Sequence, residues 1–133
     1  MKIRAEDIDK ARALLPGLFK FNEGEKFSQA ILCLSEDMLF IYGDHAPDYS
    51  DQEEKVYHVK MRFPMENINT VVDEKLMKQP ELAAVDRIAI LASNDETYYF
   101  YYFNDNKKAV NNFLAGLKHY GYPFQSHKLN MSM

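Results

Sequence analysis

The sequence predicts a mainly antiparallel β domain that ends in one packing helix. Six consecutive aromatic residues at 98–103 form the strongest β-type run in the chain. An amphipathic helical pattern follows over about residues 105–120. Between residues 55 and 63, apolar and polar side chains alternate with the period of a strand. A sheet covered on its inner face by the final helix accounts for all three observations.

Composition and charge narrow the class of protein. The chain has 133 residues, of which 47% are hydrophobic and 27% charged, as expected for one globular domain. Its formal net charge of −4 disfavours a nucleic-acid partner and an anionic membrane surface. The single cysteine, Cys33, excludes an intrachain disulfide, and its apolar surroundings predict a buried, inert thiol. Because no signal peptide or membrane-spanning segment is evident, we expect a cytoplasmic protein.

The first 21 residues are expected to form a helical lead-in. Apolar residues recur at helical spacing between residues 5 and 15, and two acids lie in the first turn, where the helix dipole favours them. Pro16 and Gly17 then end this helix. An extended segment at 18–21 leads to a turn at 22–25.

The next segment has the pattern of an antiparallel hairpin. Two β-type runs at 27–34 and 38–42 are separated by Ser35-Glu36-Asp37. Residues 43–54 are polar, include Pro47, and are expected to form a solvated loop. The acids of this loop lack the ligand spacing of a calcium-binding EF-hand.

The alternation over 55–63 predicts one core face and one basic face. The core face would carry Tyr57, Val59, Met61 and Phe63, and the basic face His58, Lys60 and Arg62 together with Val56. The basic face is a candidate partner-binding or anion-binding stripe. The alternative is an ordinary solvated strand face.

Two more strands are expected before the aromatic run. The chain turns at 64–67 into a short strand at 68–72, followed by a polar connection at 73–86 in which residues 80–84 can form a helical turn. Residues 87–93 form the next strand, with Ile88 and Ile90 on one face. A turn at 94–96 joins this strand to the aromatic run.

The final helix has a recognisable beginning and end. Asn104 or Asp105 can cap it, and Gly121 lies where a left-handed C-terminal cap belongs. Pro123 prevents its continuation, and residues 125–133 show no periodicity, so we expect a frayed tail. The apolar stripe that must lie on the sheet consists of Ala109, Val110, Phe113, Leu114 and Leu117.

This order of elements resembles the pleckstrin-homology-like (PH-like) superfamily, in particular small bacterial PH-like and GRAM-type domains, over about residues 22–121. The resemblance implies a bent antiparallel β-sandwich or barrel of about seven strands plugged by the C-terminal helix. Together with the chain length, this predicts a single domain over 1–133, with a lead-in at 1–21, the PH-like part at 22–121 and a tail at 122–133. The residues that carry the resemblance are Gly24-Glu25, the turn 63–68 with Val71, Tyr98-Tyr99-Phe100, and the helix residues Phe113 and Leu117.

Two departures limit what the resemblance implies. Eukaryotic PH domains usually carry a tryptophan in the final helix, and this chain has none. Phosphoinositide-binding members place lysine and arginine around the first hairpin turn, where this chain has Ser35-Glu36-Asp37. The resemblance therefore implies a scaffold and no lipid-binding residues.

The aromatic run suggests where a partner would bind. A helix can cover only one face of the strand, so either Tyr98, Phe100 and Tyr102 or Tyr99, Tyr101 and Phe103 must point away from it. The outward rings either form a contact surface or pack under the lead-in helix or the long connection. The candidate partner surface comprises Tyr99 and Tyr101 with the basic residues His58, Lys60 and Arg62.

We therefore expect a non-catalytic intracellular binding or scaffolding module that binds a protein partner or associates with itself through an exposed sheet face. The alternatives are a small α+β enzyme or small-ligand carrier with a pocket, and a weak anionic-lipid binding module. No catalytic residue, metal site or cofactor is predicted, because no glycine-rich loop opens a helix and the histidines lack metal-ligand spacing. The four histidines are His45, His58, His119 and His127.

Overall fold

The computed structural model describes residues 2–3, 11–20, 26–44, 56–76 and 85–129. These ranges contain nine strands, one α-helix and the 3₁₀ turn η2 (Met65–Asn67). The strands are β1 (Lys2–Ile3), β2 (Ala13–Phe19), β3 (Ser28–Leu34), β4 (Met38–Asp44), β5 (Val56–Pro64), β6 (Ile68–Leu76), β7 (Val85–Ala92), β8 (Thr97–Phe103) and β9 (Phe124–Leu129), and the helix is α1 (Lys107–His119).

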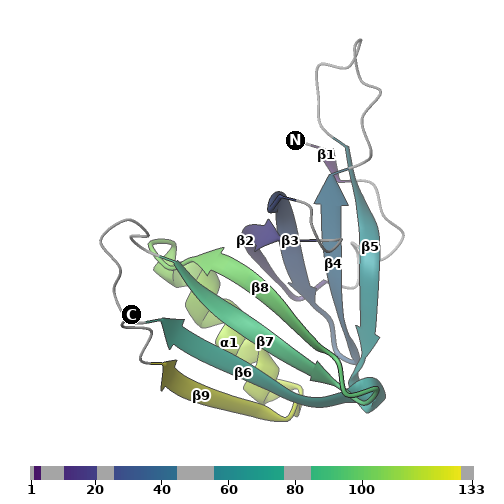
Figure 1. The fold of residues 1–133 in the computed structure, drawn as a ribbon, viewed down its shortest axis with the longest axis vertical. Coiled ribbons are helices and arrows are strands. Elements are labelled where there is room, and N and C mark those ends of the chain that lie inside the picture. The colour runs from purple at the N-terminus through teal and green to yellow at the C-terminus, as the bar shows by residue number, and fades with distance from the viewer. Residues whose placement is uncertain (1, 4–10, 21–25, 45–55, 77–84, 130–133) are drawn as a thin grey trace.

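The strands form one bent sheet in the order β1-β5-β4-β3-β2-β8-β7-β6-β9. Figure 1 shows two halves, β2 to β5 and β6 to β9, that diverge from each other, with α1 behind the second half. All neighbouring strands are antiparallel except β1 with β5 and β6 with β9. The predicted fold class, a PH-like β-sandwich capped by a C-terminal helix, is confirmed.

The two halves meet where β2 crosses β8. Only Gly17 and Leu18 of β2 pair with β8, opposite Tyr102 and Tyr101. A Cβ atom on Gly17 would lie 2.0 Å from the carbonyl oxygen of Tyr101. The crossing therefore requires a residue without a side chain.

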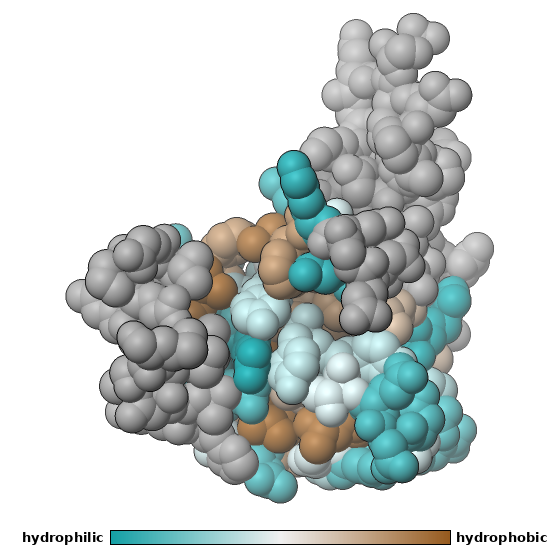
Figure 2. Space-filling view, in the orientation of Figure 1, coloured by the Kyte–Doolittle hydropathy of each residue, from teal (hydrophilic) through white to brown (hydrophobic). Residues whose placement is uncertain are grey.

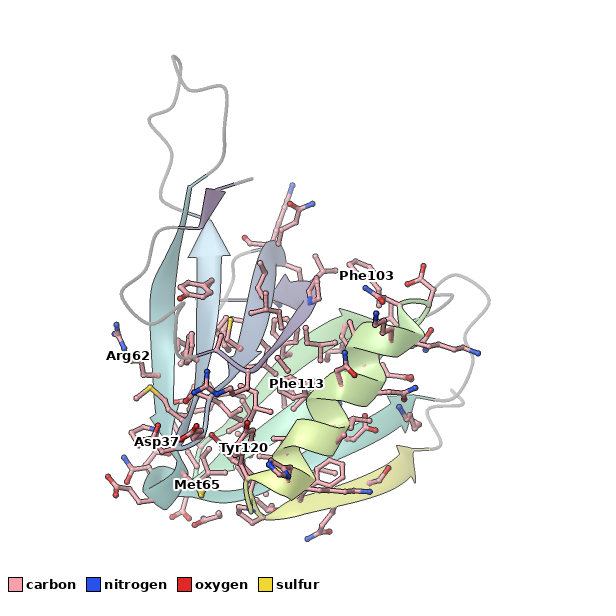
Figure 3. The ribbon with its side chains drawn as sticks, turned by 180° about the vertical axis from the view of Figure 1, so that it is seen from behind. Asp37, Arg62, Met65, Phe103, Phe113 and Tyr120 are labelled. Atoms are coloured by element: carbon pink, nitrogen blue, oxygen red, sulfur yellow. The ribbon has the colours of Figure 1, made fainter. Side chains whose placement is uncertain are left out.

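Helix α1 packs its apolar stripe into the core that both halves of the sheet share. Asn106 caps it by accepting a hydrogen bond from the Ala109 amide at 3.3 Å, so the cap lies one or two residues beyond the predicted positions. Val110, Phe113 and Leu117 are buried, as the apolar stripe predicts, and Figure 3 shows Phe113 directed toward the strands. The helix ends at His119, and Gly121, two residues beyond it, has a φ of 82°, which confirms the left-handed cap.

The core lies between α1 and the inner faces of both halves. It includes Leu15 and Phe19 of β2, Ile88 and Ile90 of β7, and Phe100 of β8. A second cluster lies on the opposite face of β3 and β4 and is also buried: Ile31, Cys33, Phe40 and Tyr42. Burial raises the pKa of the Cys33 thiol, which fits the inert cysteine that the sequence predicts.

The lead-in helix prediction is wrong for the residues that the structure describes. Ala13, Leu14 and Leu15 begin strand β2, and Pro16 and Gly17 lie inside it. Along this strand Leu15, Gly17 and Phe19 are buried while their neighbours are more exposed, which is a period of two. Residues 4–10 lie outside the described ranges.

Two other predicted segments contain strands that the sequence did not suggest. Asp73 to Leu76 extend β6, and Val85 and Asp86 begin β7, so the predicted connection at 73–86 is shorter; its proposed helical turn at 80–84 is not described. The expected frayed tail instead contains β9, which pairs with β6 in parallel from Phe124 to Leu129. Most of the predicted solvated loop, residues 45–54, lies outside the described ranges.

Three of the predicted turns match the structure, whereas the predicted turn at 22–25 lies outside the described ranges. The β3–β4 hairpin turns at Ser35-Glu36-Asp37, η2 joins β5 to β6, and β7 joins β8 through a turn in which Asp95 has a φ of 69°. Tyr122, just after α1, donates a hydrogen bond to the carbonyl oxygen of Ser35 at 2.9 Å. This bond ties the end of the helix to the first hairpin.

Replacing Gly17 with alanine should lower the free energy of unfolding by at least about 2 kcal/mol, because the new methyl group overlaps backbone and cannot be relieved by a side-chain rotation. Chemical denaturation measures this loss. Gly121→Ala is the comparison: nothing lies within 4 Å of its added Cβ, so only the φ of 82° opposes it and the cost should be about 1 kcal/mol. Equal losses in the two variants would contradict the assignment of Gly17 to a steric role.

Native Cys33 should react with a thiol reagent such as dithionitrobenzoate at least about a hundredfold more slowly than the chain unfolded in guanidinium chloride, because its thiol is buried and its pKa raised. The absorbance of the released thiolate gives both rates. A native rate close to the unfolded rate would show that the second cluster opens readily.

Candidate partner-binding surface

Burial distinguishes the two faces of the aromatic strand β8. Phe100 and Tyr102 are fully buried, because Phe100 pairs with Ile88 of the core and Tyr102 lies two residues farther along the same face. The outward set is therefore Tyr99, Tyr101 and Phe103. Tyr99 is 40% exposed and Phe103 is 43% exposed.

Phe27, just before β3, extends this face. It is 47% exposed, and its ring meets the edge of Tyr101 with 5.2 Å between centroids. The ammonium of Lys20 lies 4.9 Å from the Phe27 ring. We call Phe27, Tyr99, Tyr101 and Phe103 the aromatic surface; Figure 2 looks onto β7 and β8, where pale and brown side chains gather.

Arg87 of β7 holds the tyrosines of the aromatic surface in place. Its guanidinium lies 4.2 Å from the centre of the Tyr99 ring and donates a hydrogen bond to the Tyr101 hydroxyl at 3.2 Å. It also forms an ion pair with Glu74 of β6, and both side chains are mostly buried. Burial alone would lower the pKa of Arg87, but its hydrogen bonds to Tyr101 and Glu74 raise it. A permanent cation thus lies beside the exposed ring of Tyr99 and the half-buried ring of Tyr101.

Polar side chains on the inner side of β8 hold the buried ring of Tyr102 in place. The Tyr102 hydroxyl donates to the buried Asp73 carboxylate at 2.7 Å, and Lys75 contacts both, at 2.9 Å from the Tyr102 oxygen and 3.0 Å from Asp73. Burial, and then the bond to Asp73, raises the pKa of Tyr102. Nearby, Asn104 donates to Asp86 at 2.8 Å. These hydrogen bonds satisfy the polar side chains that lie near the C-terminal end of β8.

The structure brings together only part of the predicted partner surface. Tyr99 and Tyr101 lie side by side, whereas Arg62 is exposed on β5, with β4, β3 and β2 between it and β8. Figure 3 shows Arg62 on the side of β5 that is remote from α1. The tyrosines and Arg62 therefore do not form one contact area.

The basic stripe does not keep the regular alternation that the sequence predicts. A register shift between β4 and β5 places Met61 opposite Ile41 but Val59 opposite Tyr42. Because Ile41 and Tyr42 lie on opposite faces of β4, Met61 and Val59 do not share the one core face that the sequence predicts. His58 pairs with Gly43 in this register. For residues 56–60 the structure describes the backbone of β5 alone, so the side chains of His58 and Lys60 are not placed.

Sequence reasoning missed Phe27, Lys20 and Arg87 as parts of the surface. Arg87 was recognisable only as the polar position before Ile88 in an alternating strand. The signal for Phe27 was an aromatic residue at a predicted strand start, and the crossing of β2 and β8 that places it beside Tyr101 is not encoded locally.

The described residues offer no assembled metal site, since no three histidine, cysteine, aspartate or glutamate side chains among them converge. Helix α1 is too short and too polar to cross a bilayer, and no other described helix could do so.

Comparisons with known proteins support the fold and go no further. No family model matches the sequence, and no curated protein matches it in sequence. Among solved structures, Vav1 bound by an allosteric inhibitor that blocks its GEF activity is similar with a TM-score of 0.53 and 9% identity over 87% of this chain. The chain corresponds to only 29% of that Vav1 chain. The hSac2 domain of the human phosphoinositide phosphatase Sac2 is similar with a TM-score of 0.51 and 11% identity, over 92% of this chain and 79% of that one. These neighbours share the PH-like fold with this chain. Because the identities are so low, the similarity shows the fold alone.

Replacing Arg87 with lysine should lower the free energy of unfolding by about 1 kcal/mol, because an ammonium keeps the charge but cannot stack on Tyr99 and bond Tyr101 and Glu74 together. Chemical denaturation measures the change. Arg12→Lys is the matched control: Arg12 pairs with Glu36 at 3.1 Å on the exposed surface, and its replacement should have no measurable effect. An unaffected Arg87→Lys variant would mean that the rings do not depend on the guanidinium.

Proposed function

We propose that this protein is a non-catalytic binding module that docks another protein through the aromatic surface, in the first place a second copy of itself. The observation that carries the proposal is the gathering of Phe27, Tyr99 and Phe103, each 40% to 47% exposed, on one face of the sheet. Large apolar side chains exposed together are uncommon on a monomer and favour an interface. Aromatic rings also supply contact area at a low cost in side-chain entropy.

The charges on this face favour a second copy as the first partner. A two-fold symmetric contact requires a surface that is complementary to itself. Arg87 and Glu74 lie side by side behind the rings and neutralise each other, so two copies can approach without charge repulsion. The rings can then pack against their symmetry equivalents.

The proposal includes two finer points. We place the protein in the cytoplasm because its one cysteine is free and buried. We also relate it to the small bacterial PH-like and GRAM-type domains, on the strength of the turn at residues 63–68 and the aromatic strand that precedes the capped helix.

The self-association can be measured as solution mass against concentration, by sedimentation or light scattering. The wild-type chain should form a dimer with increasing concentration, and the double variant Tyr99→Asp/Phe103→Asp should weaken dimerisation at least about a hundredfold, because it places two charges among desolvated rings. Asn111→Asp, an exposed change on α1, is the control and should dimerise like the wild type. A chain that stays monomeric at NMR concentrations, or a double variant that dimerises normally, would rule out self-association through this surface.

A further inference from the structure

A second surface lies on the other side of β2, between this strand and α1. It is an open groove of about 1120 Å³, lined on the strand side by Arg12, Ala13 and Leu14. On the helix side it is lined mainly by Lys108, Ala109, Asn112, Ala115, Gly116 and His119. None of its residues belongs to the aromatic surface.

Small side chains keep this groove open. Ala13 and Ala115 face it from opposite sides, and Gly116 packs directly over Leu34 at its floor. A Cβ atom on Gly116 would lie 2.3 Å from a methyl group of Leu34, so the helix backbone itself forms part of the floor. Leu14, 39% exposed, adds an apolar edge. A polypeptide can therefore approach both walls closely.

The strand side of the groove has an unpaired edge. From Ala13 to Pro16, β2 pairs with β3 on one side, but its pairing with β8 is confined to Gly17 and Leu18. No other described strand pairs with this part of β2. Such an edge can accept an extended peptide through backbone hydrogen bonds.

The groove also carries cationic side chains, although the protein as a whole is negative. The cations are Lys108, near the N-terminal end of α1, and Arg12, which Glu36 partly neutralises, while the His119 imidazole at the other end of α1 adds a hydrogen-bonding group. Lys108 has no ion-pair partner within the described residues. None of the described lining residues carries a carboxylate. Charge complementarity therefore favours an acidic occupant.

We infer that this groove binds an extended, acidic segment of a partner protein, which adds to the open edge of β2 and directs carboxylates toward Lys108 and His119. The 13 residues of α1 span about 20 Å, which is the length of about six extended residues. The open strand edge distinguishes this occupant from a membrane surface, which has no backbone to pair with β2. This site is independent of the aromatic surface and of the self-association proposed for it.

An alternating glutamate–threonine peptide is a suitable probe, since it is acidic and favours an extended chain. Titrated into the full-length isotope-labelled protein, it should shift the amide NMR signals of Ala13, Leu14 and the groove side of α1. The alternating lysine–threonine peptide should not bind. Shifts confined to β8, or no binding of the acidic peptide, would overturn the inference.

Two pairs of variants locate the site. Lys108→Glu should weaken binding of the acidic peptide at least about tenfold, whereas Lys107→Glu, in the same helix turn but outside the groove, should change it less than about threefold. Asn112→Trp should block the groove, whereas Asn111→Trp, an adjacent exposed position that does not line it, should bind normally.

The remaining outcomes are also decisive. Equal effects within either pair would overturn the inference. So would binding of phosphatidylserine vesicles that Lys108→Glu abolishes, because the groove would then serve a membrane. The double variant Tyr99→Asp/Phe103→Asp should keep its affinity for the peptide, which separates failure of this inference from failure of the proposed self-association.

Discussion

The fold depends on the close crossing of β2 and β8 at Gly17. This contact joins the two halves of the sheet, and it involves only two residues of each strand. The Tyr101 carbonyl oxygen and the Phe100 ring occupy the space that a side chain on Gly17 would need. Because the strands pair there and separate on the N-terminal side of β2, one glycine permits both the closed core and the open edge beside α1.

The crossing also determines how the aromatic strand is used. With β8 held between β2 and β7, Phe100 must face the core residues Ile88 and Phe113, and the alternate positions must face outward. The inner set is held further by the bond from Tyr102 to Asp73, a buried carboxylate that Lys75 compensates. Breaking the inward orientation of Tyr102 would leave Asp73 and Lys75 without this partner, so the two faces of the strand cannot exchange.

The sequence was sufficient where a local pattern and the tertiary structure agree. The first hairpin, the turn at Met65 to Asn67 and the stripe of α1 all combine a turn or cap signal with a matching period. In the aromatic run the type of element was predictable, but both alternating sets are apolar, so the buried set could not be deduced from this run alone. Only its pairing with Ile88 and Ile90 resolves the choice.

The errors occurred where long-range pairing determines the structure. Leu14 and Leu15 fit a helical period, yet their strand follows the buried alternation of Leu15, Gly17 and Phe19. Pro16 argued against a strand, but it lies on the part of β2 that has no partner toward β8, where a missing amide is tolerated. Strand β9 lies at the edge of the sheet and pairs with β6 through backbone hydrogen bonds. Such pairing does not require an alternating apolar pattern, so the sequence carries no strand signal there.

The two proposed surfaces share β2 but lie on different sides of it. Leu18 pairs with Tyr101 beside the aromatic surface, whereas Ala13 and Leu14 line the groove, and Gly17 separates these two parts of the strand. A partner in the groove would extend the sheet from the open edge without displacing any ring of β8. Because Gly17 is locked against the Tyr101 backbone, β2 has little freedom to transmit a shift from one surface to the other. The arrangement therefore favours independent occupation of the two surfaces, as in a scaffold that holds a second copy and an acidic segment at the same time.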